Sequence, residues 1–212
     1  MPNFITEIKS KKIIIGVDEV GRGPWAGPVV AAACIFPNPK NKEIDINSFN
    51  DSKKLSKIQR ENAFNHIKEL KKNSLINYKI GEANVKEIDS LNILQASLLA
   101  MKRALDQFLN LSKTNALIIV DGIHKPEIKG IECKAIVKGD QKSISIAAAS
   151  IIAKVYRDKV MVKLSKSFPI YDWENNMGYG TKKHLEGLKS KGISKHHRKS
   201  FKPVKSFIQK NS

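Results

Sequence analysis

Three apolar segments of this sequence end abruptly at acidic residues, and this feature restricts the fold more than any other. The segments are residues 12–18, 116–120 and 133–137, and the acids at or just beyond their ends are Asp18 with Glu19, Asp121 and Asp140. Short runs rich in Ile, Val and Ala that stop at polar or glycine residues are typical of buried β-strands. We therefore expect three strands that carry carboxylates at their carboxyl-terminal ends.

Helical patterns lie between the predicted strands. Ser56 and Gln59 have the spacing of a capping box, which predicts the start of a helix. The apolar stripe predicted for this helix is Ile58, Ala63, Ile67 and Leu70. Apolar residues at spacings of three and four from Leu91 to Phe108 predict a second helix with one continuous buried face. A third helix is expected at about 143–164.

Two more strands are predicted at residues 29–36 and 74–81. Strands and helices in this order predict an α/β fold, with a mixed sheet flanked by helices. The length of 212 residues suits one domain. Within it we expect a core from about 12 to 165 and a helical, basic C-terminal extension from about 166 to 212.

The chain carries a large excess of positive charge. Lys and Arg number 38 against 20 acids, and the formal net charge at pH 7 is +18. Residues 182–212 contain ten Lys or Arg and a single acid, Glu186, which gives this tail a charge of +9. Such a tail favours binding to nucleic acid, with an affinity that falls steeply as salt rises. A general bias of the composition toward lysine is the alternative explanation.

The cysteines and the amino terminus favour a reduced compartment. Cys34 and Cys133 are far apart, and each lies in an apolar segment, which predicts packed thiols rather than a disulfide framework or a zinc site. Residues 1–12 are too polar for a signal peptide. No apolar run approaches the ~20 residues that span a bilayer. We therefore expect a cytoplasmic protein without a membrane partner.

Four carboxylates at strand ends point to metal chemistry. Ionised carboxylates that lie close together repel one another, so a cluster of them needs cations. Their hard oxygen atoms suit Mg²⁺ or Mn²⁺, and two such ions about 3.5–4 Å apart can catalyse phosphodiester cleavage. Each acid alone is more simply explained as a cap or turn residue. The set of four within a basic protein favours catalysis.

Gly21-Arg22-Gly23-Pro24 follows the acidic pair almost directly. Glycine leaves the backbone open to close approach by a ligand, and an arginine can hold a phosphate through two hydrogen bonds. An ordinary turn between two strands explains the glycines and the proline equally well.

These segments together resemble the signature blocks of ribonuclease HII. The blocks, in family order, are GVDEVGRGPWAGPVV at 16–30, DSKKL at 51–55, VDG at 120–122, KGD at 138–140, AASIIAKVYRD at 148–158, GYGT at 178–181 and HRKSF at 197–201. Three departures are minor: Val20, Trp25 and Lys199 stand where Ala, Leu and Arg are expected. The resemblance implies a ribonuclease H-like fold with a helical C-terminal extension. The sequence leaves the oligomeric state open, and a monomer is the default expectation.

The resemblance also implies roles for the matching residues. The metal-binding and catalytic set is Asp18, Glu19, Asp121 and Asp140. The substrate-binding set is Gly21, Arg22, Gly23, Lys53, Lys54, Tyr179 and Arg198. The Gly-Arg-Gly segment is expected to grip the backbone around a ribonucleotide and to sense its 2′-hydroxyl, the group that distinguishes RNA from DNA. Tyr179 is expected to stack on the next deoxyribose, and the remaining basic residues are expected to contact phosphates.

The implied activity is that of an endoribonuclease that uses two Mg²⁺ or Mn²⁺ ions. It would cut on the 5′ side of ribonucleotides embedded in duplex DNA, leave 5′-phosphate and 3′-hydroxyl ends, and degrade the RNA of RNA·DNA hybrids. The implied biological role is removal of misincorporated ribonucleotides. A ribonuclease HIII, a related metal-dependent exonuclease and a nucleic-acid-binding module without catalysis remain alternatives.

Two further features are expected to lie outside the metal site. Asp158 follows Arg157 within a predicted helix, which favours a structural ion pair. His196 and His197 show no zinc spacing and are expected to be solvated or to face phosphate.

Overall fold

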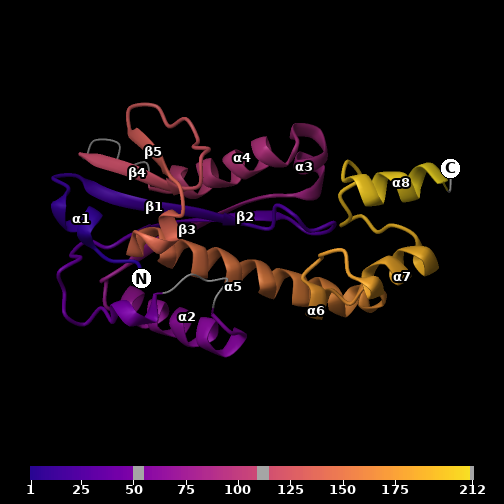
Figure 1. The fold of residues 1–212 in the computed structure, drawn as a ribbon, viewed down its shortest axis with the longest axis horizontal. Coiled ribbons are helices and arrows are strands. Elements are labelled where there is room, and N and C mark those ends of the chain that lie inside the picture. The colour runs from indigo at the N-terminus through magenta and orange to yellow at the C-terminus, as the bar shows by residue number, and fades with distance from the viewer. Residues whose placement is uncertain (50–54, 109–114, 211–212) are drawn as a thin grey trace.

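A mixed five-stranded sheet lies at the centre of the molecule (Figure 1). The computed structural model describes residues 1–49, 55–108 and 115–210. The strands are β1 Ile13–Val20, β2 Val29–Ile35, β3 Asn77–Ala83, β4 Ala116–Asp121 and β5 Glu132–Ile136. They lie in the order β3-β2-β1-β4-β5, with β1 antiparallel to β2 and parallel to β4. Each predicted strand is therefore confirmed, with its ends shifted by three residues or fewer.

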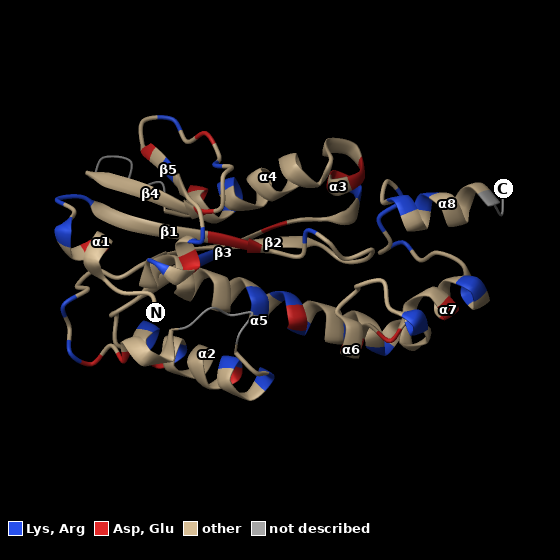
Figure 2. Ribbon diagram, in the orientation of Figure 1, with Lys and Arg blue, Asp and Glu red and all other residues tan. Residues whose placement is uncertain are grey.

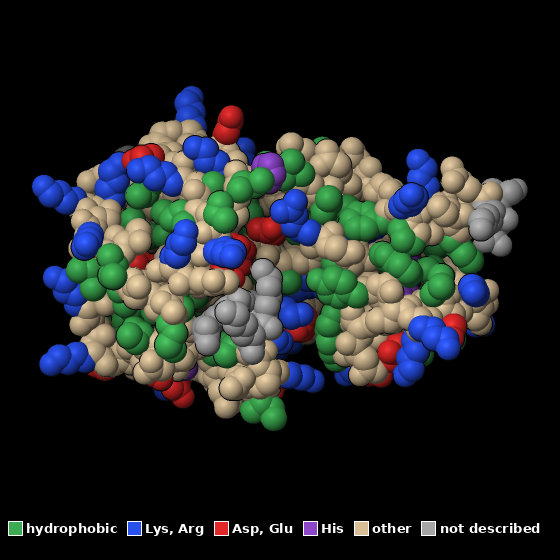
Figure 3. Space-filling view, viewed as in Figure 1, with side chains coloured by type: hydrophobic (Ala, Val, Ile, Leu, Met, Phe, Trp, Pro, Cys, Tyr) green, Lys and Arg blue, Asp and Glu red, His purple; other side chains and the backbone are tan. Residues whose placement is uncertain are grey.

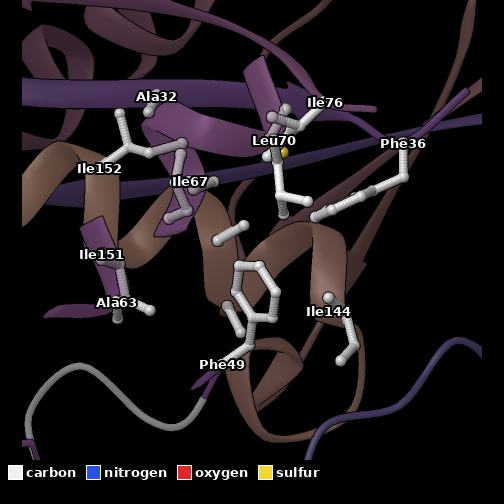
Figure 4. Packing of buried hydrophobic residues seen from close by; sticks show 14 of the residues in the cluster. Ala32, Phe36, Phe49, Ala63, Ile67, Leu70, Ile76, Ile144, Ile151 and Ile152 are labelled. Atoms are coloured by element: carbon white, nitrogen blue, oxygen red, sulfur yellow. The ribbon is translucent and has the colours of Figure 1, made fainter. Parts of the chain in front are cut away.

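Helices cover both faces of the sheet. They are α1 Ile5–Lys9, α2 Lys57–Lys72, α3 Val85–Leu91, α4 Ile93–Asp106 and α5 Ile144–Ser167. Alternate residues of β2 point to opposite faces, so that Ala32 packs in the core formed with α2 and α5, and Ala31 in the core formed with α4. Figure 4 shows the first core, in which Ile67 and Ile152 lie beside Ala32. β2 is consequently buried along its whole length.

Helix α5 lies very close to β1. Gly16, in the middle of β1, has no side chain, and a Cβ atom there would overlap the backbone of Ser145. The next turn of α5 contains Ala147, Ala148 and Ala149, all fully buried. Small residues on both elements let the helix approach the strand. This approach brings the Ser150 hydroxyl into hydrogen-bonding contact with Asp18.

The prediction of one helix from Leu91 to Phe108 is wrong. Asn92 has a φ of 69°, which ends α3, and its side chain then caps α4 by accepting hydrogen bonds from the amides of Leu94 and Gln95. Asparagine tolerates this left-handed conformation better than most residues. The apolar spacing therefore continues across a break between two helices, and only the backbone conformation of Asn92 shows this break.

Small residues place α4 on the sheet together with Met101, Leu105 and Phe108, the buried part of the predicted apolar row. The fully buried members of this face are Ala96, Ala100 and Ala104. Gly81 of β3 packs against them so tightly that a Cβ atom would overlap the carbonyl oxygen of Ala100, whereas Leu91 is 41% exposed. In α2 the capping box is confirmed, but Ile58 of the predicted stripe is 72% exposed.

The C-terminal extension builds a separate small core beyond one end of the sheet (Figure 1). Its helices are α6 Trp173–Asn176, α7 Lys182–Lys191 and α8 Lys202–Lys210. Tyr171, Trp173 and Leu188 pack there with Ala26 and Met161.

Two sequence expectations about thiols and membrane spans can be compared with the structure. Cys34 is buried and Cys133 is half-buried, and both are free thiols. In the part of the chain that the structure describes, no helix has the length and apolar character needed to cross a bilayer.

Gly16→Ala should lower the free energy of unfolding by about 3 kcal/mol, because the added methyl group forces α5 away from β1. Gly130→Ala is the matched control, since its φ of 79° is strained for alanine but no atom lies within 4 Å of the added Cβ. Strain alone should cost about 1–2 kcal/mol there. Urea unfolding of both variants measures the difference, and equal losses contradict the close helix–strand packing.

Candidate active site

The carboxylates expected at the strand ends come from three neighbouring strands. β1 and β4 run parallel with Val17 opposite Val120, so the next residues, Asp18 and Asp121, lie side by side. Asp140 lies in the short 3-10 helix Gly139–Gln141 that follows β5, and its amide points at Asp121 Oδ1 at 3.4 Å. The sheet topology thus gathers residues that are more than 100 positions apart.

Burial and repulsion from neighbouring acids make ionisation of Asp18 and Glu19 unfavourable. Asp18 is only 4% exposed, and its pKa is raised well above the usual value by burial, then by the charges of Glu19 and Asp121. The pKa of Glu19 is also raised by burial, although Arg22 counteracts this from 3.3 Å. Figure 2 shows the acidic end of β1 near the middle of the molecule. A cation at this position removes the repulsion.

The carboxylates fit a hard divalent cation by their chemistry, but their present contacts are with the protein. Among the described residues, no group of three or more His, Cys, Asp or Glu is gathered closely enough to hold an ion. Asp121 Oδ1 accepts a hydrogen bond from the amide of Gly139 at 2.6 Å, and Glu19 faces Arg22. Binding of a metal therefore requires these side chains to turn. All the available donors are oxygen atoms, which Mg²⁺ and Mn²⁺ prefer.

A cavity of about 290 Å³ opens beside the acids, and sequence reasoning missed most of its wall. Its lining is Glu19, Arg22, Leu94, Ser97, Leu98, Met101, Asp121, Gly122, Ile123 and His124. The apolar side comes from α4, whose leucines were interpreted as core residues. Their spacing gave no signal that this edge of the helix borders a site.

The Gly-Arg-Gly loop comprises residues 21–28 and contacts two buried arginine side chains, those of Arg157 and Arg198. Arg157 donates to the carbonyl oxygens of Pro28 (2.9 Å), Ala26 (3.0 Å) and Met177 (2.9 Å). Gly21 has a φ of 94°, and a Cβ atom on it would overlap the guanidinium group of Arg157. Glycine is therefore required here by both backbone conformation and space.

The prediction that Arg198 contacts phosphate is wrong. This side chain is completely buried. Its guanidinium group donates to the carbonyl oxygens of Gly21, Arg22, Gly27 and Pro28. Burial lowers the pKa of Arg198 to about 9, so it stays charged at neutral pH. All three nitrogen atoms of this guanidinium group donate to the loop, and the side chain is shielded from solvent.

The carboxylate of Asp89 binds the segment that follows Arg198. Asp89 of α3 accepts hydrogen bonds from the amide of Lys199 at 3.0 Å and from the amide and hydroxyl of Ser200 at 2.9 and 2.6 Å. The extension is thus attached to both α3 and the Gly-Arg-Gly loop.

Tyr179 lies where the loop and the extension meet. Its side chain is 46% exposed, and a Cβ atom on Gly23 would be 3.4 Å from its ring. The backbone of the same segment pairs with the loop, because the Trp25 amide donates to the Gly178 carbonyl at 2.8 Å. Arg22, Gly23 and Tyr179 therefore form one surface, whereas Gly21 is buried against Arg157. Lys53 and Lys54 lie outside the described residues.

The remaining predictions concern Asp158 and the two histidines. Asp158 forms ion pairs, as predicted, but with Lys154 (2.8 Å) and Arg60 (3.8 Å) rather than with the neighbouring Arg157. The prediction that His196 and His197 are solvated or face phosphate is wrong for His197, whereas His196 is half-buried. His197 is 1% exposed, and the His196 ring packs edge-on against aromatic rings of the extension.

Fold and carboxylates together define the class of protein: the mixed sheet with acids at the ends of adjacent central strands is the ribonuclease H-like fold, as predicted. The sequence model of the ribonuclease HII family matches residues 15–204. The chain therefore belongs to the ribonuclease HII family, and it is a ribonuclease H, an enzyme that acts on nucleic acid.

Individual relatives support this assignment. Ribonuclease HII from Pelagibacter ubique (strain HTCC1062) is 50% identical over 197 residues, which cover 93% of this chain and 100% of the relative. The crystal structure of ribonuclease H2 from Pyrococcus horikoshii OT3 matches with a TM-score of 0.67 and 26% identity, over 93% of this chain and 97% of that one. Bst-RNase HIII, solved in complex with Mn²⁺, matches with a TM-score of 0.74 over 99% of this chain and 73% of that one. Its identity of 19% supports the fold alone.

Acid should weaken the extension through His197. Burial, then the nearby His184, lower the pKa of His197 to about 3, and His196 adds to this effect. The unfolded chain binds a proton below the ordinary value of 6.5, whereas the folded chain does not, so stability falls as pH drops from about 6.5 toward 3. Thermal melts between pH 7.5 and 4.5 should decline more steeply for the unaltered protein than for His197→Gln. Parallel declines contradict a buried, neutral His197.

Proposed function

We propose that the protein hydrolyses the phosphodiester bond on the 5′ side of ribonucleotides embedded in duplex DNA, and also degrades the RNA of RNA·DNA hybrids. The products carry 5′-phosphate and 3′-hydroxyl ends, and the biological role is removal of ribonucleotides from DNA. The observation that carries this proposal is the position of the acidic strand ends beside the loop that Gly23 leaves open toward Tyr179.

The acids Asp18, Glu19 and Asp121, with Asp140, would hold two Mg²⁺ or Mn²⁺ ions. When bound, such ions supply an activated water and stabilise the departing 3′ oxygen. The Mn²⁺ complex of Bst-RNase HIII, which shares the fold, supports this choice of ions. Ser150 orients Asp18 by a hydrogen bond from its hydroxyl. Arg22 holds Glu19 until substrate phosphate competes for its guanidinium group.

Recognition of the ribonucleotide falls to the backbone of the Gly-Arg-Gly loop. Arg157 and Arg198 occupy the carbonyl oxygens on the inner side of this loop, which fixes its conformation before substrate binds. Gly23 leaves space next to the ring of Tyr179. A deoxyribose stacked on that ring places the preceding 2′-hydroxyl against the loop, and this favours an RNA-to-DNA junction.

A basic groove leads away from the acids along α5. It is a cavity of about 560 Å³ between α2 and α5, lined by Lys57, Arg60, Glu61, Lys154, Val155, Asp158, Lys159, Val162, Lys163, Lys166, Asn175 and Met177. Lys154 lies one helical turn beyond Ser150, about 6 Å along α5. Figure 3 shows basic side chains spread over this face, with acidic atoms near its middle. Phosphates of a duplex follow this groove, and Lys53, Lys54 and the basic extension add further contacts.

A labelled DNA duplex that contains one ribonucleotide tests the proposal. With Mg²⁺ or Mn²⁺ we expect a single cut on the 5′ side of the ribonucleotide, and none with a chelator. Asp18→Asn should lower the rate by at least about 1000-fold, since it removes a metal ligand, while duplex binding persists. Asp106→Asn, which alters an acid away from the site, is the matched control and should cut at the normal rate.

Other outcomes of this assay identify the alternatives. Cutting restricted to longer RNA stretches of a hybrid contradicts the junction role of Tyr179 and favours activity of the HIII type. Salt-sensitive binding without metal-dependent cutting favours a binding module.

Metal binding should also be visible in thermal stability. The raised pKa of Asp18 means that its ionised form opposes folding, and this loss of stability is complete at pH above the raised value. In a chelator at pH 7.5, Asp18→Asn should therefore melt at a higher temperature than the unaltered protein. Added Mn²⁺ should stabilise the unaltered protein and leave the variant nearly unchanged, because a ligand of the native state raises its stability. Equal shifts contradict the metal site.

A further inference from the structure

Two buried histidines of the extension form a chain of hydrogen bonds that ends on the backbone of Tyr179. His197 Nδ1 accepts from the amide of Ser194 at 2.9 Å. The Nε2 atoms of His197 and His184 lie 3.0 Å apart, and His184 Nδ1 lies 2.9 Å from the carbonyl oxygen of Tyr179. Both rings are shielded from water, with exposed fractions of 1% and 0%.

The fixed donors around the pair determine where each proton lies. The Ser194 amide is a donor, so His197 Nδ1 is an acceptor and the proton of that ring is on Nε2. The Trp173 indole, which can only donate, points at His184 Nε2 at 3.1 Å, so the proton of His184 is on Nδ1. His197 thus donates to His184, and His184 donates to Tyr179.

This arrangement excludes the usual functions of a histidine. A second proton on His184 would put an N–H group against both the Trp173 indole and the Nε2–H of His197. Burial accordingly lowers the pKa of both histidines, that of His197 to about 3. With each ring nitrogen already engaged, the pair is unsuited to acid–base catalysis or to metal binding. The remaining contact of the pair is the hydrogen bond from His184 Nδ1 to the carbonyl oxygen of Tyr179.

The same histidine is packed against the substrate loop. The rings of His184 and Trp25 are 5.3 Å apart between centroids, and Gly180 lies so close to the Trp25 ring that a Cβ atom there would overlap it. Trp25, one of the departures from the family pattern, thus fills the space between the histidine pair and the Tyr179 segment.

We propose that His184 and His197 are positioning residues, which act as a neutral pair to fix Tyr179 relative to Gly23 and so set the preference for a ribonucleotide followed by a deoxyribonucleotide. This inference rests on the proposed function. The hydrogen bond from His184 to the Tyr179 carbonyl holds the segment that carries the ring, while the ring itself stays exposed for stacking.

Two conservative substitutions separate this role from general packing. His184→Asn keeps an N–H donor near the position of Nδ1, whereas His184→Gln extends its amide toward the position of Nε2. The measured quantity is the ratio of kcat/KM for a duplex with one ribonucleotide to kcat/KM for an RNA·DNA hybrid. We expect the glutamine variant to lose about five- to tenfold of this ratio, the effect of one hydrogen bond, and the asparagine variant to lose less than about twofold.

A double variant tests whether the effect passes through Tyr179. In a Tyr179→Ala background, His184→Gln should have no further effect on the ratio, since coupled residues are not additive. His196→Gln, in the same aromatic cluster, is the matched control and should leave the ratio unchanged. The proposal is overturned if His184→Gln only lowers the melting temperature, or if its effect on the ratio is the same with and without Tyr179. Failure of the proposed function is distinct, because then the unaltered protein does not cut at a single ribonucleotide.

Discussion

Two buried guanidinium groups hold the functional half of this molecule together. Arg157 comes from the long helix α5 and Arg198 from the extension, and both donate to carbonyl oxygens of one loop. The loop has no regular secondary structure that would satisfy those carbonyl oxygens. The guanidinium N–H groups are therefore the hydrogen-bond donors that a neighbouring strand would otherwise supply. A buried charge is tolerated when it is fully hydrogen-bonded. The hydrogen bonds that these two arginines donate consequently connect the core, the loop and the extension.

The acids of the candidate site lie deeper than the lysines that line the groove. Asp18 is buried at the end of a central strand, while the lysines of the groove lie along the outer side of α5. The surface charge attracts a polyanion from a distance, and the buried acids oppose its final approach. In the proposed mechanism a divalent cation would resolve this conflict, and productive binding of the substrate would then depend on the metal.

The sequence predicted those parts of the fold that depend on local patterns. All five strands and the acids at their ends follow from apolar runs and their boundaries, and the family blocks added Tyr179. The helix break at Asn92 was not predicted because the apolar spacing continues through it. The structural roles of Arg198 and of the histidine pair were not predicted for another reason. Their partners are set by tertiary packing, with a separation of 177 positions between Arg198 and Gly21, and no local pattern encodes such contacts.

The attachment of Arg198 to the loop also orders events during synthesis of the chain. The loop is made early, but its carbonyl oxygens receive the guanidinium group of Arg198 only after this residue has been translated, 177 positions after Gly21. Asp89 likewise receives its hydrogen bonds only after Lys199 and Ser200 have been made. Folding during synthesis proceeds from the amino terminus. The sheet with its acids can therefore form before this loop has both of its arginine partners, and the loop of a nascent chain stays incomplete until residue 198 has left the ribosome.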